Sequence, residues 1–120
     1  MIQAARSFIR VMRGAALFTQ AGGMKVVNYV AYTAVPGRVA ALRPAHREYM
    51  AQLHADGRLV ACGPFTDGSG ALYIYETGSL AAADEIVAAD PYLISDVFAD
   101  CKLSAWEIIK ANPVLIPATR

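Results

Sequence analysis

The chain has little of what most protein active sites are built from. Its 120 residues include only two cysteines and two histidines. Cys62 and Cys101 lack the close ligand spacing of a structural zinc site, so we expect two reduced thiols, no disulfide and no metal. No apolar run approaches the ~20 residues that a membrane-spanning helix needs. These absences favour a cytoplasmic protein without a membrane partner.

Three further absences narrow the possible functions. The sequence contains no glycine-rich phosphate loop, no Ser-His-Asp signature and no strip of alternating basic and aromatic residues. The formal net charge is only +1, whereas nucleic-acid-binding domains are commonly strongly basic. We therefore expect no cofactor and no nucleic-acid partner, which leaves small molecules and proteins as ligands.

What the chain has in excess is apolar side chains. Hydrophobic residues make up 56% of the sequence, against about 45–50% in typical domains. A chain of this length fits one domain and can bury a core without a metal or a disulfide. An apolar surplus in so small a domain indicates a second buried surface, and we expect that surface to be the interface of a homodimer.

The first residues differ from the rest of the chain. Residues 1–23 are basic, contain no acid and end in Ala-Gly-Gly, after which a strand pattern begins at Met24. We expect 1–23 to be a loose extension outside the fold or the result of a start codon assigned too early, with an amphipathic helix and a targeting peptide as the open alternatives. The domain itself is predicted to span 24–112, and residues 113–120 to form an irregular tail.

The remaining pattern predicts alternating strands and helices. Runs of β-branched and aromatic residues predict strands over 25–33, 58–65, 71–77 and 98–110. One helix is predicted to begin at Pro44, a residue suited to the first helical position, and to stop at Gly57. A second helix is predicted over 80–89, between an N-cap at Ser79 and the break at Asp90-Pro91.

The order β-α-β-β-α-β is that of the ferredoxin-like α+β fold, in which two helices cover one face of an antiparallel sheet. The other face would be polar in a monomer, yet the predicted strands carry apolar residues on both faces. We therefore expect two copies to pack their open sheet faces together.

Two short motifs carry the candidate chemistry. Arg43-Pro44-Ala45-His46 opens the first helix, and Asp90-Pro91-Tyr92 follows the second. His46 shares a helical stripe with Met50 and Leu53, so it is predicted to face the sheet. Side-by-side antiparallel helices would bring His46 to Asp90, beside a pocket, where an aspartate can orient a general base. The plainer alternatives are that His46 is a buried core histidine and that Asp90 is an ordinary polar residue at a helix end.

Together with Leu53-His54-Ala55-Asp56-Gly57-Arg58-Leu59 and Cys62-Gly63-Pro64, these motifs resemble the YCII-related family of the dimeric α+β barrel superfamily. The resemblance covers about residues 24 to 110. It implies a ferredoxin-like protomer, a homodimer and a site built from His46 and Asp90. The chemistry assigned in that family is elimination from small ring compounds by dehydrochlorination.

Two interpretations of function follow. In the first, the protein is a lyase or isomerase: His46 removes a proton from a small, cyclic, anionic compound, and Asp90 orients it. The helix N-terminus would keep the imidazole neutral. Arg43 and the backbone near Gly63 would stabilise the negative charge that develops on the substrate, and Pro64 and Tyr92 would line the pocket. In the second, a non-catalytic dimer binds a small metabolite, and the His–Asp pair is structural. A pocket open to one imidazole nitrogen would favour the first.

Overall fold

The computed structural model describes residues 23–116. Residues 1–22 of the extension predicted over 1–23, with the alternatives for it, and residues 117–120 of the predicted tail lie outside this range. The described elements follow the predicted order, with one short helix added: β1 (Met24–Tyr32), α2 (Arg38–Ala55), β2 (Leu59–Pro64), β3 (Gly70–Thr77), α3 (Leu80–Ala88), α4 (Pro91–Ile94), β4 (Phe98–Trp106) and a 3-10 turn (Pro113–Leu115).

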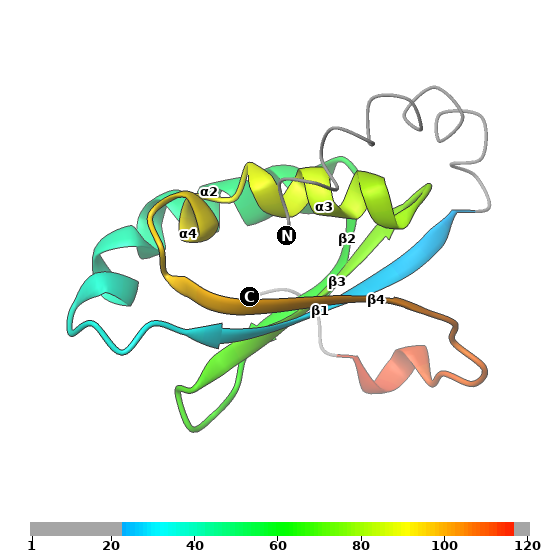
Figure 1. The fold of residues 1–120 in the computed structure, drawn as a ribbon. Coiled ribbons are helices and arrows are strands. Elements are labelled where there is room, and N and C mark those ends of the chain that lie inside the picture. Colours follow the sequence, from blue (N-terminus) through cyan, green and yellow to red (C-terminus); the bar gives the residue numbers. More distant parts are fainter. Residues whose placement is uncertain (1–22, 117–120) are drawn as a thin grey trace.

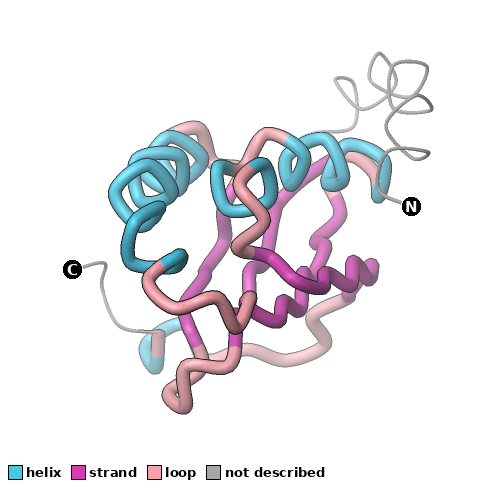
Figure 2. Tube along the Cα trace, turned by 60° about the vertical axis from the view of Figure 1, so that its left-hand side comes forward, coloured by secondary structure: helices cyan, strands magenta, loops and turns pink. Residues whose placement is uncertain are grey.

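The four strands form one antiparallel sheet in the order β2-β3-β1-β4. Since β3 separates β1 from β2, the unit is a split βαβ, and the ferredoxin-like α+β fold is confirmed. The helices α2, α3 and α4 form a layer on one face of this sheet, and the 3-10 turn lies on the other side of it (Figures 1 and 2).

The core lies between the helices and the sheet. Alternate residues of β1 and β3 point to the helices, as the period of a strand requires, and meet a buried stripe of α2 that includes His46, Met50 and Leu53. On the open face, β1 and β3 place half-buried or exposed apolar side chains, but β4 places Asp100, Lys102 and Ser104. Trp106, opposite Lys25, is the apolar residue of β4 on this face, so the expected apolar surplus is limited there to the end of the strand.

The first helix starts earlier than predicted. It begins at Arg38, after Gly37 with φ 78°, so Pro44 lies inside it and His46 lies beyond its first turn. Proline cannot donate to the carbonyl one turn earlier. That carbonyl belongs to Ala40, which is exposed, so water can satisfy it. The influence of the helix N-terminus fades within the first turn, and the proposed effect on His46 is therefore wrong.

Two bulges decide which side chains face the helices. In β4, the register passes from Ala31–Asp100 to Tyr32–Phe98, leaving Ala99 without a partner of its own. Phe98 consequently stays on the helix-covered face together with Cys101. In β2, the register skips Val60 and places Cys62 opposite Tyr73. β4 ends at Trp106, so the strand predicted to reach residue 110 is too long.

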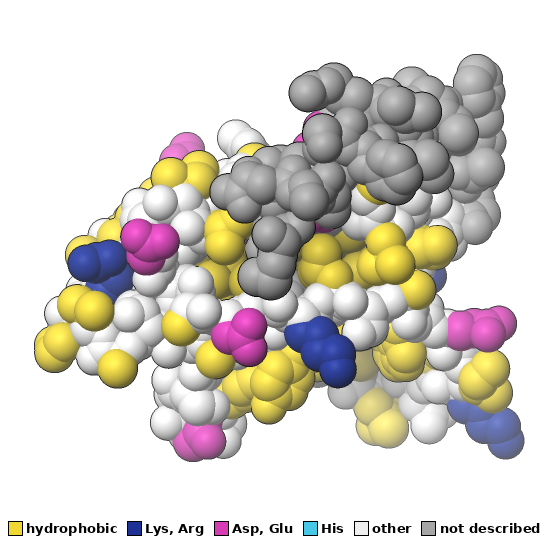
Figure 3. All heavy atoms as spheres, in the orientation of Figure 1, with side chains coloured by type: hydrophobic (Ala, Val, Ile, Leu, Met, Phe, Trp, Pro, Cys, Tyr) yellow, Lys and Arg dark blue, Asp and Glu magenta, His cyan; other side chains and the backbone are white. Residues whose placement is uncertain are grey.

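The surface carries no concentrated charge in the view of Figure 3, where acidic and basic side chains are scattered among hydrophobic ones. Within residues 23–116, no helix is long and apolar enough to cross a membrane. The cytoplasmic location stays a prediction.

Candidate active site

The predicted contact between His46 and Asp90 is confirmed. The imidazole Nδ1 lies 2.8 Å from Asp90 Oδ1, and the two residues are 7% and 0% exposed. Asp90 is the N-cap of α4, and the same oxygen accepts a hydrogen bond from the backbone N–H of Tyr92 at 2.9 Å. The pair therefore forms between the interior of α2 and the junction of α3 with α4.

The partners of the imidazole fix its tautomer. A carboxylate only accepts, so Nδ1 carries the proton and donates it to Asp90. Nε2 then offers a lone pair, and the hydroxyl of Tyr73, 3.1 Å away, donates to it. Asp90 Oδ2 is buried without a hydrogen-bond partner. A proton arriving on Nε2 would create a positive charge beside this poorly compensated negative one, which stabilises the imidazolium.

Aromatic rings enclose the histidine. The ring of Tyr92 stacks on that of His46, with centroids 3.7 Å apart and planes at 5°. Tyr73 and Phe98 approach it edge-on at 5.6 and 6.3 Å. The imidazole is thereby held in one orientation, and its Nε2 is covered by the Tyr73 hydroxyl.

The aromatic side chains continue toward the surface. Tyr32 is half-buried, and its ring lies edge-on to that of Tyr92 with centroids 5.9 Å apart. The Tyr92 hydroxyl donates to the backbone carbonyl of Val39 at 3.5 Å, and the charge of the exposed Arg43 acts on both Tyr92 and Tyr32. Burial raises the pKa of Tyr32, Tyr73 and Tyr92 and outweighs the lowering effect of Arg43 on two of them. All three are therefore neutral phenols near neutral pH.

The structure brings together some of the predicted site residues and separates others. Arg43, His46, Asp90 and Tyr92 form one cluster. Gly63 pairs with Leu72 and so belongs to the open sheet face, away from that cluster.

The β2 residues beside Gly63 take the helix-covered face. Pro64 pairs with Ala71, and Cys62 pairs with Tyr73. Burial and, second, the charge of Asp90 raise the pKa of the Cys62 thiol. Cys62 was expected only as a small apolar strand residue, and it lies near the pair.

Tyr32 and Tyr73 were not predicted as site residues. A signal for Tyr73 exists, because a buried tyrosine needs a partner for its hydroxyl, and strand alternation puts it on the helix-covered face. Tyr32 lies at the end of β1, where the bulge in β4 disturbs the register, and no local sequence pattern identifies it.

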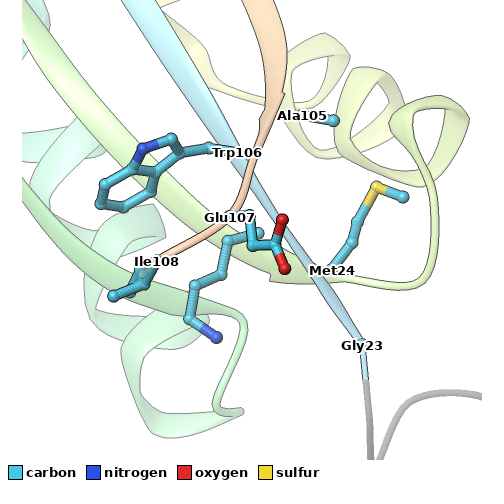
Figure 4. A pocket seen from close by; sticks show the side chains of 7 residues that line it. Gly23, Met24, Ala105, Trp106, Glu107 and Ile108 are labelled. Atoms are coloured by element: carbon cyan, nitrogen blue, oxygen red, sulfur yellow. The ribbon is translucent and has the colours of Figure 1, made fainter. Parts of the chain in front are cut away.

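A hollow of about 590 Å³ lies at the opposite end of β1 and β4 from Tyr32 and Phe98. It is lined by Gly23, Met24, Lys25, Ala105, Trp106, Glu107 and Ile108. Figure 4 shows Trp106 and Ile108 on one side of it and Met24 on the other. None of the predicted site residues lines this hollow, so the pocket beside His46 stays a prediction.

Metal ligation finds no support within residues 23–116, where no three acidic, histidine or cysteine side chains gather. Cys62 and Cys101 are both free thiols, as expected.

Comparisons with known proteins place this geometry in a family context. Residues 24–107 match the family described as the YCII-related domain. The uncharacterised protein YjpA of Bacillus subtilis is 37% identical over 65 residues, which cover 54% of this chain and 75% of YjpA. A solved structure of 5-chloro-2-hydroxyhydroquinone dehydrochlorinase (TftG) from Burkholderia phenoliruptrix, in complex with 2,5-dihydroxybenzoquinone, aligns with a TM-score of 0.61. It is 21% identical and covers 70% of this chain and 94% of its own, so this likeness shows the fold.

Proposed function

The chain belongs to the YCII-related domain family, and we propose that it is a lyase or isomerase whose base is the His46–Asp90 pair. The observation that carries this proposal is the buried hydrogen bond of 2.8 Å between Nδ1 and Oδ1. It leaves Nε2 as the proton acceptor of a neutral imidazole, which is the form that a general base requires.

The surroundings favour a small anionic ring compound as the substrate. Arg43 is an exposed cation at the outer end of the tyrosine cluster, where it can stabilise a phenolate or carboxylate. Elimination fits these groups. The substrate's O–H bond breaks and its proton passes to the base. The electron pair forms a carbonyl as a proton is returned to the ring carbon that bears the leaving group, which gives a keto tautomer. The base then removes a second O–H proton, whose electron pair forms another carbonyl through the ring while the leaving group departs with its bonding electrons. The shared fold with a dehydrochlorinase supports this class of reaction.

Chloride release from a defined set of compounds tests the proposal. The hydroquinone panel consists of 5-chloro-2-hydroxyhydroquinone and other chlorinated hydroquinones, with 2,5-dihydroxybenzoquinone as a binding probe. We expect the full chain to accelerate chloride release and the His46→Ala variant to lose the acceleration. His54→Ala is the matched control, because His54 lies on the same helix and is exposed. A wild-type protein no faster than His46→Ala on every compound would overturn the proposal.

One observation favours the second candidate, a non-catalytic dimer that binds a small metabolite. Both nitrogens of His46 are hydrogen-bonded within the protein, and the residue is only 7% exposed. This candidate predicts that 2,5-dihydroxybenzoquinone binds without any chloride release from the chlorinated compounds. It also predicts that His46→Ala binds the probe as well as the wild type does.

The proposed assembly is a homodimer that packs the two open sheet faces together. Tyr29 and Trp106 are 58% and 44% exposed on this face, and the Tyr29 ring lies 5.1 Å from that of Phe65. Pairing would remove these rings from water. Light scattering should give the dimer mass for the full chain and for a chain beginning at Met24. Tyr29→Glu should shift it toward monomer. A wild-type monomer at micromolar concentration would contradict the assembly.

A further inference from the structure

The segment after β4 carries apolar side chains that the protomer leaves largely in water. We define residues 109–116 as the C-terminal arm. We propose that the arm of one copy packs into the hollow at the β1–β4 end of a second copy, so that a homodimer exchanges two arms. This inference rests on the proposed homodimer and goes beyond it, because it names a second contact between the copies and the segment that makes it.

The arm presents large aliphatic side chains without burying them. The exposed fractions are 78%, 89%, 73% and 66% for Ile109, Val114, Leu115 and Ile116. Two backbone hydrogen bonds of 3.0 and 3.1 Å close the 3-10 turn, and they hold the last three of these side chains beside one another. Exposed apolar clusters of this kind mark interaction sites in soluble proteins. We therefore expect another protein surface to cover the arm.

The hollow is a surface of matching character. Met24, Trp106 and Ile108 line it, and each of them is still partly exposed to water. In Figure 4 these apolar side chains stand on its two sides. Its volume of about 590 Å³ falls within the range of about 300–1,000 Å³ that is typical of sites for a drug-sized ligand. The hollow therefore has room for several aliphatic side chains.

A second copy is the occupant that the arrangement favours. Trp106 lines the hollow and also lies on the open sheet face, opposite Lys25, so the hollow continues the proposed interface. The 3-10 turn of the arm lies on this same side of the sheet (Figure 1). The arm leaves its own hollow at Ile108, and none of its residues lines that hollow. Because the same two surfaces meet twice in a twofold dimer, each copy can supply one arm and one hollow.

The charges of the two surfaces are complementary as well. In the hollow, the ammonium group of Lys25 lies 2.9 Å from a carboxylate oxygen of Glu76, and this pair is neutral as a whole. Glu107 also lines the hollow and gives it a net negative charge. The arm contains the basic Lys110 and no acidic residue. Complementary charge favours this pairing and disfavours an acidic segment in the same place.

The position of the single tryptophan makes the contact measurable. Trp106 is the only tryptophan of the chain and lines the hollow, so quenching of its fluorescence by acrylamide reports whether the hollow is covered. In the full chain, Leu115→Glu would place a charge in the contact. We expect the dimer dissociation constant from light scattering to rise at least ~10-fold, because fully burying one such side chain is worth about that factor. Where this variant is still dimeric, Trp106 should be quenched more than in the wild type.

Ile94→Glu is the matched control. Ile94 is 67% exposed, which is close to the value for Leu115, but it lies at the end of α4 in the helix layer. Its substitution should change neither the dissociation constant nor the quenching. Val114→Glu is a second arm variant at a position that is 89% exposed in the protomer, so it should fold normally and act like Leu115→Glu.

A mixing experiment decides which copy supplies the arm. Copies that carry Leu115→Glu and keep Trp106 are mixed with an excess of copies that carry Trp106→Phe and an intact arm. Only the first kind has tryptophan fluorescence. If the arm comes from the partner, quenching of Trp106 should fall to the wild-type level in the mixed dimers. If the quenching stays high, the arm covers its own copy and the exchange is wrong.

The outcomes separate the arm from the proposed function. If both arm variants dimerise and are quenched like the wild type, the arm does not fill the hollow and this inference is wrong, while the proposed sheet-face dimer stands. A wild type that is monomeric at micromolar concentration overturns the dimer and the arm together. Chloride release is measured separately, so a wild type that exchanges arms but is inactive on the hydroquinone panel overturns only the proposed lyase or isomerase.

Discussion

Two buried polar clusters lie two residues apart on the same face of the sheet, and they are built on different principles. The histidine cluster contains Tyr73, His46, Asp90 and Tyr92. The asparagine cluster contains Tyr75 and Asn28, joined by the Asn28 amide that donates to the Tyr75 hydroxyl at 3.3 Å, and Cys101, whose pKa responds to Asn28. Each has a buried tyrosine of β3 at its centre.

The clusters differ in where their hydrogen bonds end. Asn28 and Tyr75 are fully buried, all members of their cluster are neutral, and Asn28 Oδ1 has no hydrogen-bond partner. The histidine cluster contains a carboxylate and a base, and its Tyr92 lies beside the half-buried Tyr32 and within the influence of the exposed Arg43. Burial of polar groups is thus common to both, whereas a carboxylate bonded to a base belongs to one. The following predictions test whether that difference divides function from structure.

The largest effect is expected for His46→Ala. Turnover should fall about 10³-fold, within the range of a lost general base, and the free energy of unfolding should fall by about 3–5 kcal/mol because Asp90 is left as an unpaired buried charge. Asn28→Ala should lower the unfolding free energy by about 1–3 kcal/mol and leave turnover unchanged. Chloride release and urea denaturation measure the two quantities. Loss of turnover in Asn28→Ala would erase the distinction between the clusters.

A smaller effect is expected for Asp90→Asn. The new amide oxygen can still accept from Nδ1 and from the backbone of Tyr92, but the negative charge that stabilises the imidazolium is gone. We expect kcat to fall about 10–100-fold, less than for His46→Ala. Asp56→Asn, at an exposed carboxylate after α2, is the control and should show no change. An Asp90→Asn variant as inactive as His46→Ala would mean that Asp90 does more than orient and stabilise.

Alkaline pH should affect both clusters equally. Burial raises the pKa of Tyr73 and Tyr75 well above the ordinary value of 10.0. Above about pH 10, the unfolded tyrosines lose protons that the folded ones keep, so stability falls as the pH rises. Each tyrosine should contribute up to ~1.4 kcal/mol per pH unit. Urea denaturation should show this slope above about pH 10 and none from either group below it, and Tyr73→Phe and Tyr75→Phe should each reduce it.

The smallest effect on the protein is expected from labelling its thiols. Burial raises the pKa of Cys101 to about 12, so very little thiolate exists near pH 8. Cys62 is exposed and should react with iodoacetamide first, at least ~10-fold faster. Mass spectrometry after timed quenching distinguishes the two. Faster labelling of Cys101 would show that the asparagine cluster opens to solvent more readily than the histidine cluster.

The sequence was sufficient for the parts of the site that depend on local periodicity. The stripe of His46, Met50 and Leu53 predicted the buried face of α2. Ser79 caps α3 by accepting from the N–H of Ala82 at 3.0 Å, as its position before a helical run predicted. Asp90-Pro91 ends the helical run because a residue before proline avoids the helical region.

The parts that failed depend on tertiary surroundings. Pro44 can lie inside a helix where water can reach the carbonyl of Ala40, one turn earlier. No local sequence rule predicts that exposure. The placement of Phe98 opposite Tyr32, on the face of the histidine, depends on strand register at the bulge in β4. A register shift of one residue exchanges the two faces of a strand. The hydrophobic pattern alone does not show that Ala99 is the extra residue of the bulge.

The bulge at Ala99 also makes β4 tolerant of a change in length. Removing Ala99 would restore regular pairing and still leave Phe98 opposite Tyr32, whereas removing a residue from the regular part of the strand would reverse the orientation of everything on one side of the deletion. The strand therefore has one position where evolution or a protein engineer can delete a residue without exposing the histidine. Relatives one residue shorter at this point would keep the same ring against the imidazole.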